Sequence, residues 1–268
     1  MWDDARTYDL ATGWFADDFA YWEGLLEEYR PGRVLDLACG TGRITLPLVA
    51  AGAALRDDFA LVGLDTSASF LRRAEAKLAD TPHADRVRLV EGDIREFDLG
   101  EPFDLILIGF NSLAYIHTIE DHLAHFRAAR RHLASGGRYA IDVQTPYLSL
   151  LAEARAAIFP PVRREIDSVQ PEPGIARFSS FYVTSRYDAA TQTEYTTHYW
   201  ETFHEDGRRE THVKDLTWHH FFPRELLLLL RQSGLEPVAQ YGNYDRSPFD
   251  EASPQHLWVM TATPEETY

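Results

Sequence analysis

The stretch Asp36-Leu-Ala-Cys-Gly-Thr-Gly42 decides the fold of this 268-residue chain. It overlaps the end of an apolar, strand-like run, Val34–Leu37, and opens a helical stretch, so we expect a strand to turn through two glycines into a helix. Gly40 and Gly42 let the backbone approach a ligand where any Cβ would collide, and the start of the helix presents free N–H groups. The turn therefore predicts a ligand site at the carboxyl end of the first core strand.

Short apolar runs alternate with helical stretches after this turn, which is typical of a parallel sheet covered by helices on both faces. Four further core strands are predicted at Leu61–Leu64, Val87–Val90, Leu105–Ile108 and Tyr139–Val143. The helix before the last of them is predicted to carry Ile119, Leu123, Phe126 and Leu133 on one face and to be capped by Gly136-Gly137. Ahead of the turn, residues 8–30 predict two short amphipathic helices.

The pattern changes after Pro146. A helical piece at 148–158 is followed by three β-rich runs at about 176–187, 192–204 and 211–222, which we interpret as an antiparallel meander. A last helix begins at Pro223 and runs through Arg231, and two strands follow at Pro237–Tyr241 and Leu257–Thr261.

The predicted fold class is α/β: a Rossmann-like, doubly wound, seven-stranded sheet with an antiparallel β insertion between the fifth strand and the last helix. The predicted domains are an N-terminal helical lid at 1–32, a ligand-binding core at 33–145, an inserted β lid or acceptor region at 146–222, and the final helix and strands of the core at 223–268.

The charge and hydropathy of the chain argue against two classes of binding partner, nucleic acids and membranes. The net charge is −16, from 42 acidic and 26 basic residues, and this balance repels nucleic acid. The longest apolar run near the C-terminal end, Leu226–Leu230, is far shorter than the roughly 20 residues that span a bilayer, so no membrane partner is expected. Cys39 is the only cysteine, and no secretory pattern opens the sequence, so we expect a cytoplasmic protein.

An acidic residue supports a nucleoside ligand. Asp65 ends the second predicted strand, 23 residues after Gly42, where a carboxylate can accept from both hydroxyls of a ribose. The dinucleotide fingerprint has a third glycine at the position of Thr45, and its loss disfavours the alternative of a nicotinamide oxidoreductase.

Four motifs in order resemble those of class I S-adenosylmethionine (SAM)-dependent methyltransferases: Asp36–Gly42, Gly63-Leu-Asp65-Thr-Ser67, Glu91-Gly-Asp93-Ile-Arg95 and Phe103–Ile108. The resemblance covers about residues 33–145 and the segment after Pro223, and it implies SAM as cofactor and S-adenosylhomocysteine (SAH) as product. It also implies roles for single residues: Gly40 and Gly42 under the methionine portion, Asp36 at its amino group, Asp65 at the ribose, Asp93 at the adenine amine, Ile94 on the adenine ring and Phe70 near the adenosine. Thr66 is a further candidate cofactor contact.

A looser resemblance links the layout to glycine and amino-sugar N-methyltransferases. Tyr8-Asp9-Leu10 is similar to their segment whose tyrosine reaches over the cofactor, and Asn111-Ser-Leu-Ala-Tyr115 is similar to their loop after the fourth strand. This resemblance implies that Tyr8 and Asn111 contact the cofactor and that Tyr115 faces the acceptor. Amino-sugar enzymes tend to have a histidine where Tyr115 stands, so their general base is not carried over. The loop also lacks the Asn/Asp-Pro-Pro-Tyr sequence of nucleobase-amine methylation.

The inserted region supplies the acceptor candidates. Either His219 or His220 is a candidate base, with Tyr115 as a further catalytic candidate, and no metal site is predicted because the histidines lack ligand spacing. Aromatic residues are enriched here, which predicts an aromatic-walled pocket. The candidate acceptor-binding residues are Tyr115, Arg177, Tyr199, Trp200, Glu201 and Trp218.

A small-molecule methyltransferase is thus the predicted activity, with an amine nitrogen as first choice because an amine needs only to lose one proton. Methylation of carbon or oxygen in an aromatic or apolar small molecule is the alternative. A nicotinamide oxidoreductase and a non-catalytic SAM-binding scaffold are the other open readings, and a homodimer is left open as the assembly.

Overall fold

The computed structural model describes residues 5–13, 15–148, 151, 162–166 and 174–263, with the backbone alone at 162–166 and 180–185. The chain divides into two compact units. The core unit comprises residues 17–145 and 221–268, and the insert unit comprises residues 1–16 and 146–220. Each is described by itself.

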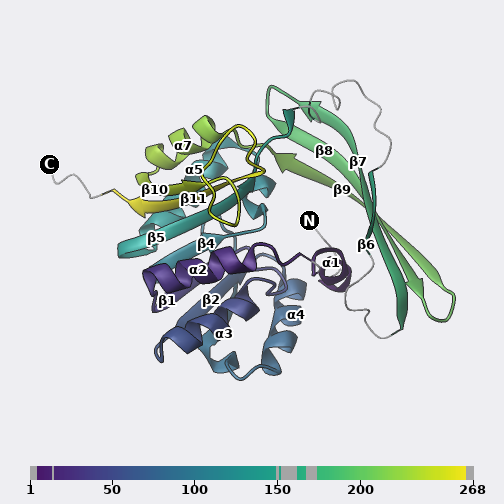
Figure 1. The fold of residues 1–268 in the computed structure, drawn as a ribbon, viewed down its shortest axis with the longest axis horizontal. Coiled ribbons are helices and arrows are strands. Elements are labelled where there is room, and N and C mark those ends of the chain that lie inside the picture. Colours follow the sequence, from purple (N-terminus) through teal and green to yellow (C-terminus); the bar gives the residue numbers. More distant parts are fainter. Residues whose placement is uncertain (1–4, 14, 149–150, 152–161, 167–173, 264–268) are drawn as a thin grey trace. The chain divides into compact units, whose positions relative to one another are not determined.

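The core unit is built on a seven-stranded sheet in the order β10-β11-β5-β4-β1-β2-β3 (Figure 1). The first five strands along the chain are parallel, and β11 is antiparallel to both of its neighbours. The strands are β1 (Arg33–Leu37), β2 (Ala60–Asp65), β3 (Val87–Glu91), β4 (Phe103–Ile108), β5 (Leu133–Gln144), β10 (Leu235–Tyr241) and β11 (Gln255–Ala262). The predicted fold class is confirmed.

Helices cover both faces of this sheet, as the alternating pattern predicts. Leucines of α7 and Phe126 of α5 bury against one face, whereas aromatic and leucine side chains of α2 and α3 bury against the other. The helices of the core unit are α2 (Phe19–Tyr29), α3 (Thr45–Leu55), α4 (Ala68–Ala79), α5 (Ile119–Arg131) and α7 (Pro223–Gln232), with short 3-10 turns η1 (Ala84–Arg86) and η2 (Ser112–Tyr115). None of the helices within the described ranges is long and apolar enough to span a membrane.

Helix α2 is part of the core rather than of a separate lid. Tyr21, Trp22, Leu25 and Leu26 are at most 1% exposed and join the cluster on the α3 side of the sheet. Burial of four large side chains stabilises α2 against the sheet, at roughly 1.5–3 kcal/mol each relative to exposure.

Two predicted boundaries are wrong: the end of the helix before β5 and the start of β5 itself. Helix α5 ends at Arg131, and Gly136-Gly137 does not cap it, because β5 already begins at Leu133 and pairs there with Phe103. The two glycines lie in an irregular part of β5, where the pairing jumps from Leu133 to Arg138.

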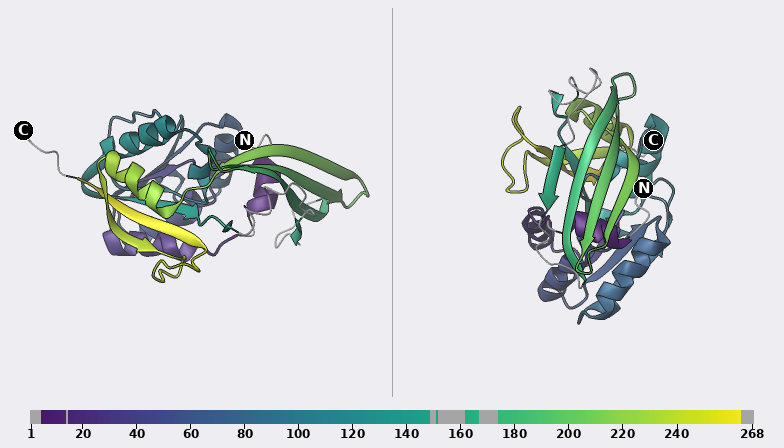
Figure 2. Two further views of the ribbon diagram at one scale, coloured as in Figure 1. Left: turned by 90° about the horizontal axis from the view of Figure 1, so that it is seen from above. Right: turned by 90° about the vertical axis from the view of Figure 1, so that its right-hand side faces the viewer.

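The insert unit is a four-stranded antiparallel sheet, β6-β7-β8-β9, with the short helix α1 (Ala5–Thr12) (Figure 2). Its strands are β6 (Val162–Ile166), β7 (Ile175–Asp188), β8 (Thr193–His204) and β9 (Arg209–His219). Leu10 of α1 packs with Ile175, Phe178 and Trp200. The predicted meander of three strands is confirmed as β7–β9, and β6 was missed.

The third β run ends earlier than the sequence predicts. It stops at His219 instead of residue 222, because Phe221 is 1% exposed in the core cluster and Phe222 is the N-cap of α7. Most of the predicted helical piece at 148–158 lies outside the described residues.

Candidate active site

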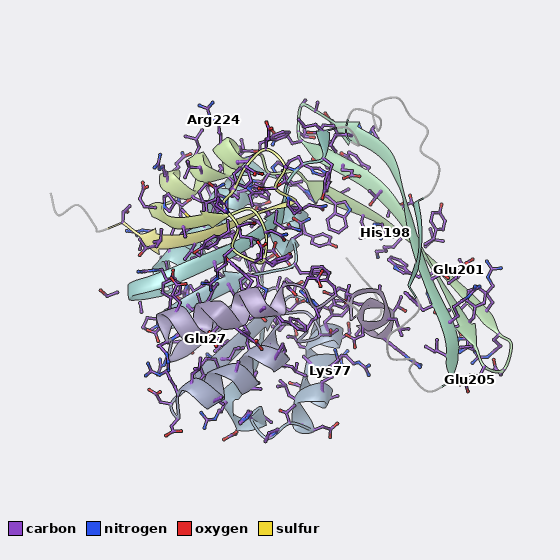
Figure 3. The ribbon with its side chains drawn as sticks, viewed as in Figure 1. Glu27, Lys77, His198, Glu201, Glu205 and Arg224 are labelled. Carbon is purple, nitrogen blue, oxygen red and sulfur yellow. The ribbon has the colours of Figure 1, made fainter. Side chains whose placement is uncertain are left out.

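The glycine turn joins β1 to α3 at the carboxyl edge of the sheet. Ala38, Gly40 and Gly42 all have positive φ, at 56°, 58° and 82°, so the chain passes through left-handed conformations that favour glycine. A Cβ on Gly42 would lie 2.3 Å from Leu46 Cδ1, so the close packing of α3 also requires glycine. Lys77 of α4 (Figure 3) donates from Nζ to the Thr41 carbonyl oxygen at 3.1 Å and so helps to hold the turn.

Asp36 lies beneath this turn. Its carboxyl group is almost fully buried, and Oδ2 accepts from the Thr45 hydroxyl at 2.6 Å. Burial raises the pKa of Asp36 to about 7, and the bond from Thr45 opposes the rise. The geometry places Asp36 as a support for the turn from within the sheet, so its predicted contact with the amino group of the cofactor stays a prediction.

Asp65 connects the glycine turn with the end of β2. Its Oδ2 accepts from the Gly40 N–H at 2.9 Å, and its Oδ1 accepts from the Ser67 N–H at 2.8 Å. Burial raises the pKa of Asp65, whereas these backbone bonds lower it. Thr66 follows in an exposed position, and Phe70 is buried in the first turn of α4, where its N–H donates to the Ser67 hydroxyl.

The loop after β3 carries Asp93 and Ile94. Asp93 accepts from the Arg95 backbone N–H at 2.9 Å and from the Arg95 guanidinium, and these bonds lower the pKa of Asp93. Arg95 also reaches Asp121 of α5 at 3.4 Å. The Ile94 side chain packs against the core cluster.

The loop after β4 is held by two side-chain bonds. Phe110 and Asn111 both have positive φ, at 53° and 56°. Asn111 Oδ1 accepts from the Gln144 N–H at 3.1 Å, and the Phe110 N–H donates to Asp142 Oδ2 at 2.8 Å. Tyr115 is half-buried at the end of η2 in the same loop. Asn111 therefore fixes the loop that presents Tyr115.

An ion pair behind the glycine turn was not predicted from the sequence. Arg43 directly follows Gly42, and its guanidinium donates to both carboxylate oxygens of Asp18 at 2.9 and 2.7 Å. The Asp18 side chain is fully buried, and 9% of the Arg43 side chain is exposed. The guanidinium also stacks 4.2 Å from the centroid of the Phe110 ring. Arg43 thus links the glycine turn, the start of α2 and the loop after β4.

Asp142 of β5 is a further buried carboxyl group. Its Oδ2 also accepts from the Tyr244 hydroxyl at 3.0 Å, whereas its buried Oδ1 has no hydrogen-bond partner among the described residues. Burial raises the pKa of Asp142 to about 7, and the Phe110 N–H opposes the rise.

This arrangement predicts how stability changes with pH. An unfolded carboxyl group titrates near pH 3.9, so between about pH 4 and pH 7 the folded protein holds protons on Asp36 and Asp142 that the unfolded chain has lost. Stability therefore falls as the pH rises through this window, by up to about 1.4 kcal/mol per pH unit for each group. Asp142→Asn, whose amide oxygen still accepts from Phe110 and Tyr244, is expected to flatten this fall in urea unfolding measured at pH 5, 6, 7 and 8. An unchanged slope would contradict the assignment.

In the insert unit, one face of the sheet gathers aromatic and titratable side chains. Glu194, His198 and Trp200 alternate along β8, and Trp218 of β9 lies opposite Glu194, so all four share one face. The ring of His198 lies 5.6 Å from that of Trp200 and 6.1 Å from that of Trp218. Burial lowers the pKa of His198 to about 4, so its imidazole is neutral.

His220 joins this face just beyond the end of β9. Its Nε2 lies 2.6 Å from Glu194 Oε2, and the Tyr187 ring packs edge-on against the imidazole. His219 lies opposite Thr193, which places it on the other face of the sheet, where it is buried. Of the two candidate bases, His220 is the one with a carboxylate partner on the aromatic face.

The other candidate acceptor residues of the insert unit lie apart from this aromatic face. Tyr199, Glu201 and Arg177 lie on the face opposite Trp200, because side chains alternate along a strand. Glu201 (Figure 3) bonds to Arg209. The Arg177 guanidinium stacks 4.0 Å from the centroid of the Phe203 ring. Tyr8 lies in α1 of the insert unit, where its carbonyl accepts from the Thr12 hydroxyl. The binding roles of these residues stay predictions.

The core geometry defines a class of protein. Carboxylates stand at the ends of β1, β2 and β3, beside a glycine turn at the point where the strand order reverses, the usual ligand position in such sheets. Carboxylates accept hydrogen bonds from ribose hydroxyls and from an exocyclic amine, and they stabilise a nearby cationic centre. This set of carboxylates therefore fits a nucleoside that carries a sulfonium.

Comparisons with known proteins agree with this class. Residues 34–137 match the family model described as a methyltransferase domain. The Cypemycin N-terminal methyltransferase of a Streptomyces species is 28% identical over 240 residues, which are 88% of this chain and 86% of that protein. The dTDP-4-amino-2,3,4,6-tetradeoxy-D-glucose N,N-dimethyltransferase of Saccharopolyspora spinosa is 37% identical over 110 residues, 41% of this chain and 39% of that protein. The structure of the sugar N-methyltransferase KedS8 from a Streptoalloteichus species matches with a TM-score of 0.72 and 21% identity, over 98% of this chain and 94% of that one.

Residues 34–137 are therefore a methyltransferase domain, and the chain is a class I SAM-dependent methyltransferase. The predicted enzyme class, the predicted cofactor and the predicted likeness to amino-sugar N-methyltransferases are confirmed. When bound, SAM supplies an electrophilic methyl group, and the residues that would hold it are those of the glycine turn, Asp65 and the loop after β3.

Proposed function

We propose that this enzyme transfers a methyl group to the amine nitrogen of a small-molecule acceptor. The observation that carries the proposal is the alignment with a protein named as an N-terminal methyltransferase, which extends over 88% of this chain and so includes the inserted region. Two further relatives are named as N,N-dimethyltransferases of amino sugars. The names of all three proteins point to nitrogen as the methyl acceptor, and they differ in the molecule that carries this nitrogen.

The acceptor nitrogen must lose a proton to expose its lone pair. In our proposal, His220 accepts this proton, with Glu194 at 2.6 Å orienting the imidazole and stabilising its charged form. The nitrogen then forms its bond to the methyl carbon as the sulfur–carbon bond breaks, and SAH leaves. Positioning supplies most of the rate enhancement in such a displacement, because little covalent help is needed.

We propose that the face of Trp200 and Trp218 receives the apolar or planar part of the acceptor. His198 is neutral on this face, so its imidazole can form a hydrogen bond with the acceptor without adding a positive charge. Tyr115 is proposed to contact the acceptor from the loop after β4, which Asn111 and Asp142 hold rigid.

The test is mass spectrometry of candidate acceptors incubated with SAM that carries a labelled methyl group. The set contains peptide N-termini, amino sugars, phenols and activated carbon acids. Label on amine nitrogen supports the proposal. Label only on a phenol or on carbon contradicts it, and SAH binding without transfer to any acceptor favours a non-catalytic scaffold.

Removing the proposed base tests its role separately from cofactor binding. His220→Asn is expected to lower kcat about 100-fold, as general-base loss does, while the affinity for SAH stays within threefold. His83→Asn is the control, because His83 directly precedes η1 and lies ahead of the first residue of β3, at the edge of the core sheet opposite the carboxyl ends of the strands. Equal kcat values in the two variants would remove His220 from the chemistry.

We further propose that the enzyme acts in the cytoplasm, with no nucleic acid or membrane as partner, and that a homodimer is its assembly in solution. The net charge of −16 supports the absence of nucleic-acid and membrane partners, because it disfavours binding to polyanionic surfaces. Light scattering of the purified chain tests whether it is a homodimer.

A further inference from the structure

His125 of α5 is a fully buried histidine with partners on both sides of its ring. Its Nδ1 lies 2.9 Å from the Ile94 carbonyl oxygen, and its Nε2 lies 2.6 Å from the Tyr139 hydroxyl of β5. The residues form a polar chain through the otherwise apolar core between α5 and the loop after β3.

The chemistry of the two partners fixes the hydrogen positions. A carbonyl oxygen only accepts, so Nδ1 carries the proton and donates to Ile94. Nε2 then accepts from the Tyr139 O–H. Burial lowers the pKa of His125 to about 4 and raises that of Tyr139, so both groups are neutral and one tautomer is selected.

The hydrogen bonds from Tyr139 through His125 hold the backbone at Ile94, in the middle of the Asp93–Arg95 segment. The Ile94 carbonyl is bonded to His125, its side chain packs on the core, and the next N–H, of Arg95, donates to Asp93. A segment fixed at three successive points has little freedom to shift. The position of the Asp93 carboxylate therefore depends on this backbone segment, and so on His125, together with the Arg95 guanidinium that also donates to it.

We propose that His125, oriented by Tyr139, is a positioning residue that gives the cofactor site its selectivity for adenine. The proposal rests on the proposed methyltransferase function and on the contacts that the family resemblance implies, with Asp93 accepting from the adenine amine and Ile94 on its ring. A base that has a carbonyl in place of this amine would bring an oxygen against the carboxylate. Discrimination against such a base requires Asp93 to be held to within about 0.5 Å.

The experiment compares the affinities for SAH and S-inosylhomocysteine by isothermal titration calorimetry. The inosine analogue carries a carbonyl where adenine has its amine. The wild type is expected to prefer SAH by at least 30-fold, because a site built to accept a hydrogen bond rejects a ligand that lacks the donor. His125→Phe is expected to reduce this preference about tenfold, mainly by weakening SAH.

Tyr139→Phe provides a second variant that retains the ring and most of its packing. Without the O–H that selects the tautomer, His125 holds Ile94 less firmly, and the preference is expected to fall about threefold. His122→Phe is the matched control. His122 is also fully buried on α5 and bonds through Nε2 to a carbonyl at 2.9 Å, but that carbonyl belongs to Ile116, outside the adenine segment.

The outcomes separate this proposal from the one on which it rests. If His125→Phe lowers the melting temperature as His122→Phe does but keeps the wild-type preference for SAH, His125 is merely structural and the proposal is overturned. An NMR spectrum with the proton on Nε2 of His125 would also overturn it. A wild type that binds both ligands equally would instead show that Asp93 does not read the adenine amine, so both proposals about this segment fail together.

Discussion

Asp18→Asn is expected to lower the free energy of unfolding by about 3–5 kcal/mol, because it removes one partner of a buried ion pair and leaves the other charge uncompensated. Asp18 accepts two bonds from Arg43, at 2.9 and 2.7 Å, and a third from Trp22 Nε1 at 3.1 Å. The amide of asparagine keeps the shape of the side chain and loses its charge.

Urea unfolding measures this loss, and Arg43→Met completes a double-mutant cycle. We expect the double variant to be more stable than the sum of the single losses predicts, since removing both charges leaves neither unpaired. Asp58→Asn is the matched control, because Asp58 forms a bidentate pair with Arg56 at the surface, with side chains 70% and 38% exposed. No measurable change is expected there. Similar losses in Asp18→Asn and Asp58→Asn would contradict the argument.

The position of this ion pair extends its effect beyond stability. Arg43 belongs to the glycine turn, Asp18 precedes α2, and the stacked Phe110 belongs to the loop that presents Tyr115. Loss of the pair frees three segments at once, so we expect the same variants to bind SAH more weakly.

Local patterns were enough to predict the core strands and the glycine turn. β1, β2, β4 and the part of β5 at Tyr139–Val143 are short apolar runs that are buried on both faces, whereas β3 is a half-buried run at the edge of the sheet. The turn is marked by Gly40 and Gly42, so neighbouring residues carry the signal. Where the outcome depended on distant partners, prediction failed. Gly136-Gly137 has the composition of a helix cap, but the pairing of Leu133 with Phe103 ends the helix before it.

The unpredicted site residues also depend on long-range contacts. Arg43 and Asp18 are 25 residues apart, and His125 is 31 residues from Ile94. A single sequence shows neither separation as a pattern. Alternation along β8 is a local rule that already separates Trp200 from Tyr199 and Glu201, although the three residues were predicted to form one acceptor group.

Asp65→Ala is expected to weaken SAH binding at least 100-fold, which corresponds to about 2.7 kcal/mol. The carboxylate holds the glycine turn through Gly40 and the start of α4 through Ser67, and it is the proposed acceptor for the ribose hydroxyls. Alanine removes all of these interactions together. Calorimetry with SAH measures the loss, and thermal unfolding reports whether the variant remains folded.

A second variant, which loses two similar backbone hydrogen bonds away from the site, distinguishes an effect on SAH binding from an effect on folding. Asp104 also accepts two backbone N–H bonds, from Gly32 at 2.8 Å and Arg33 at 3.0 Å, but it lies where β1 and β4 begin, at the opposite edge of the sheet. Asp104→Ala should therefore lower stability and leave SAH affinity within threefold. If the two alanine variants lost affinity equally, the carboxylate of Asp65 would be acting only on the fold, and the ribose contact would have to come from another residue.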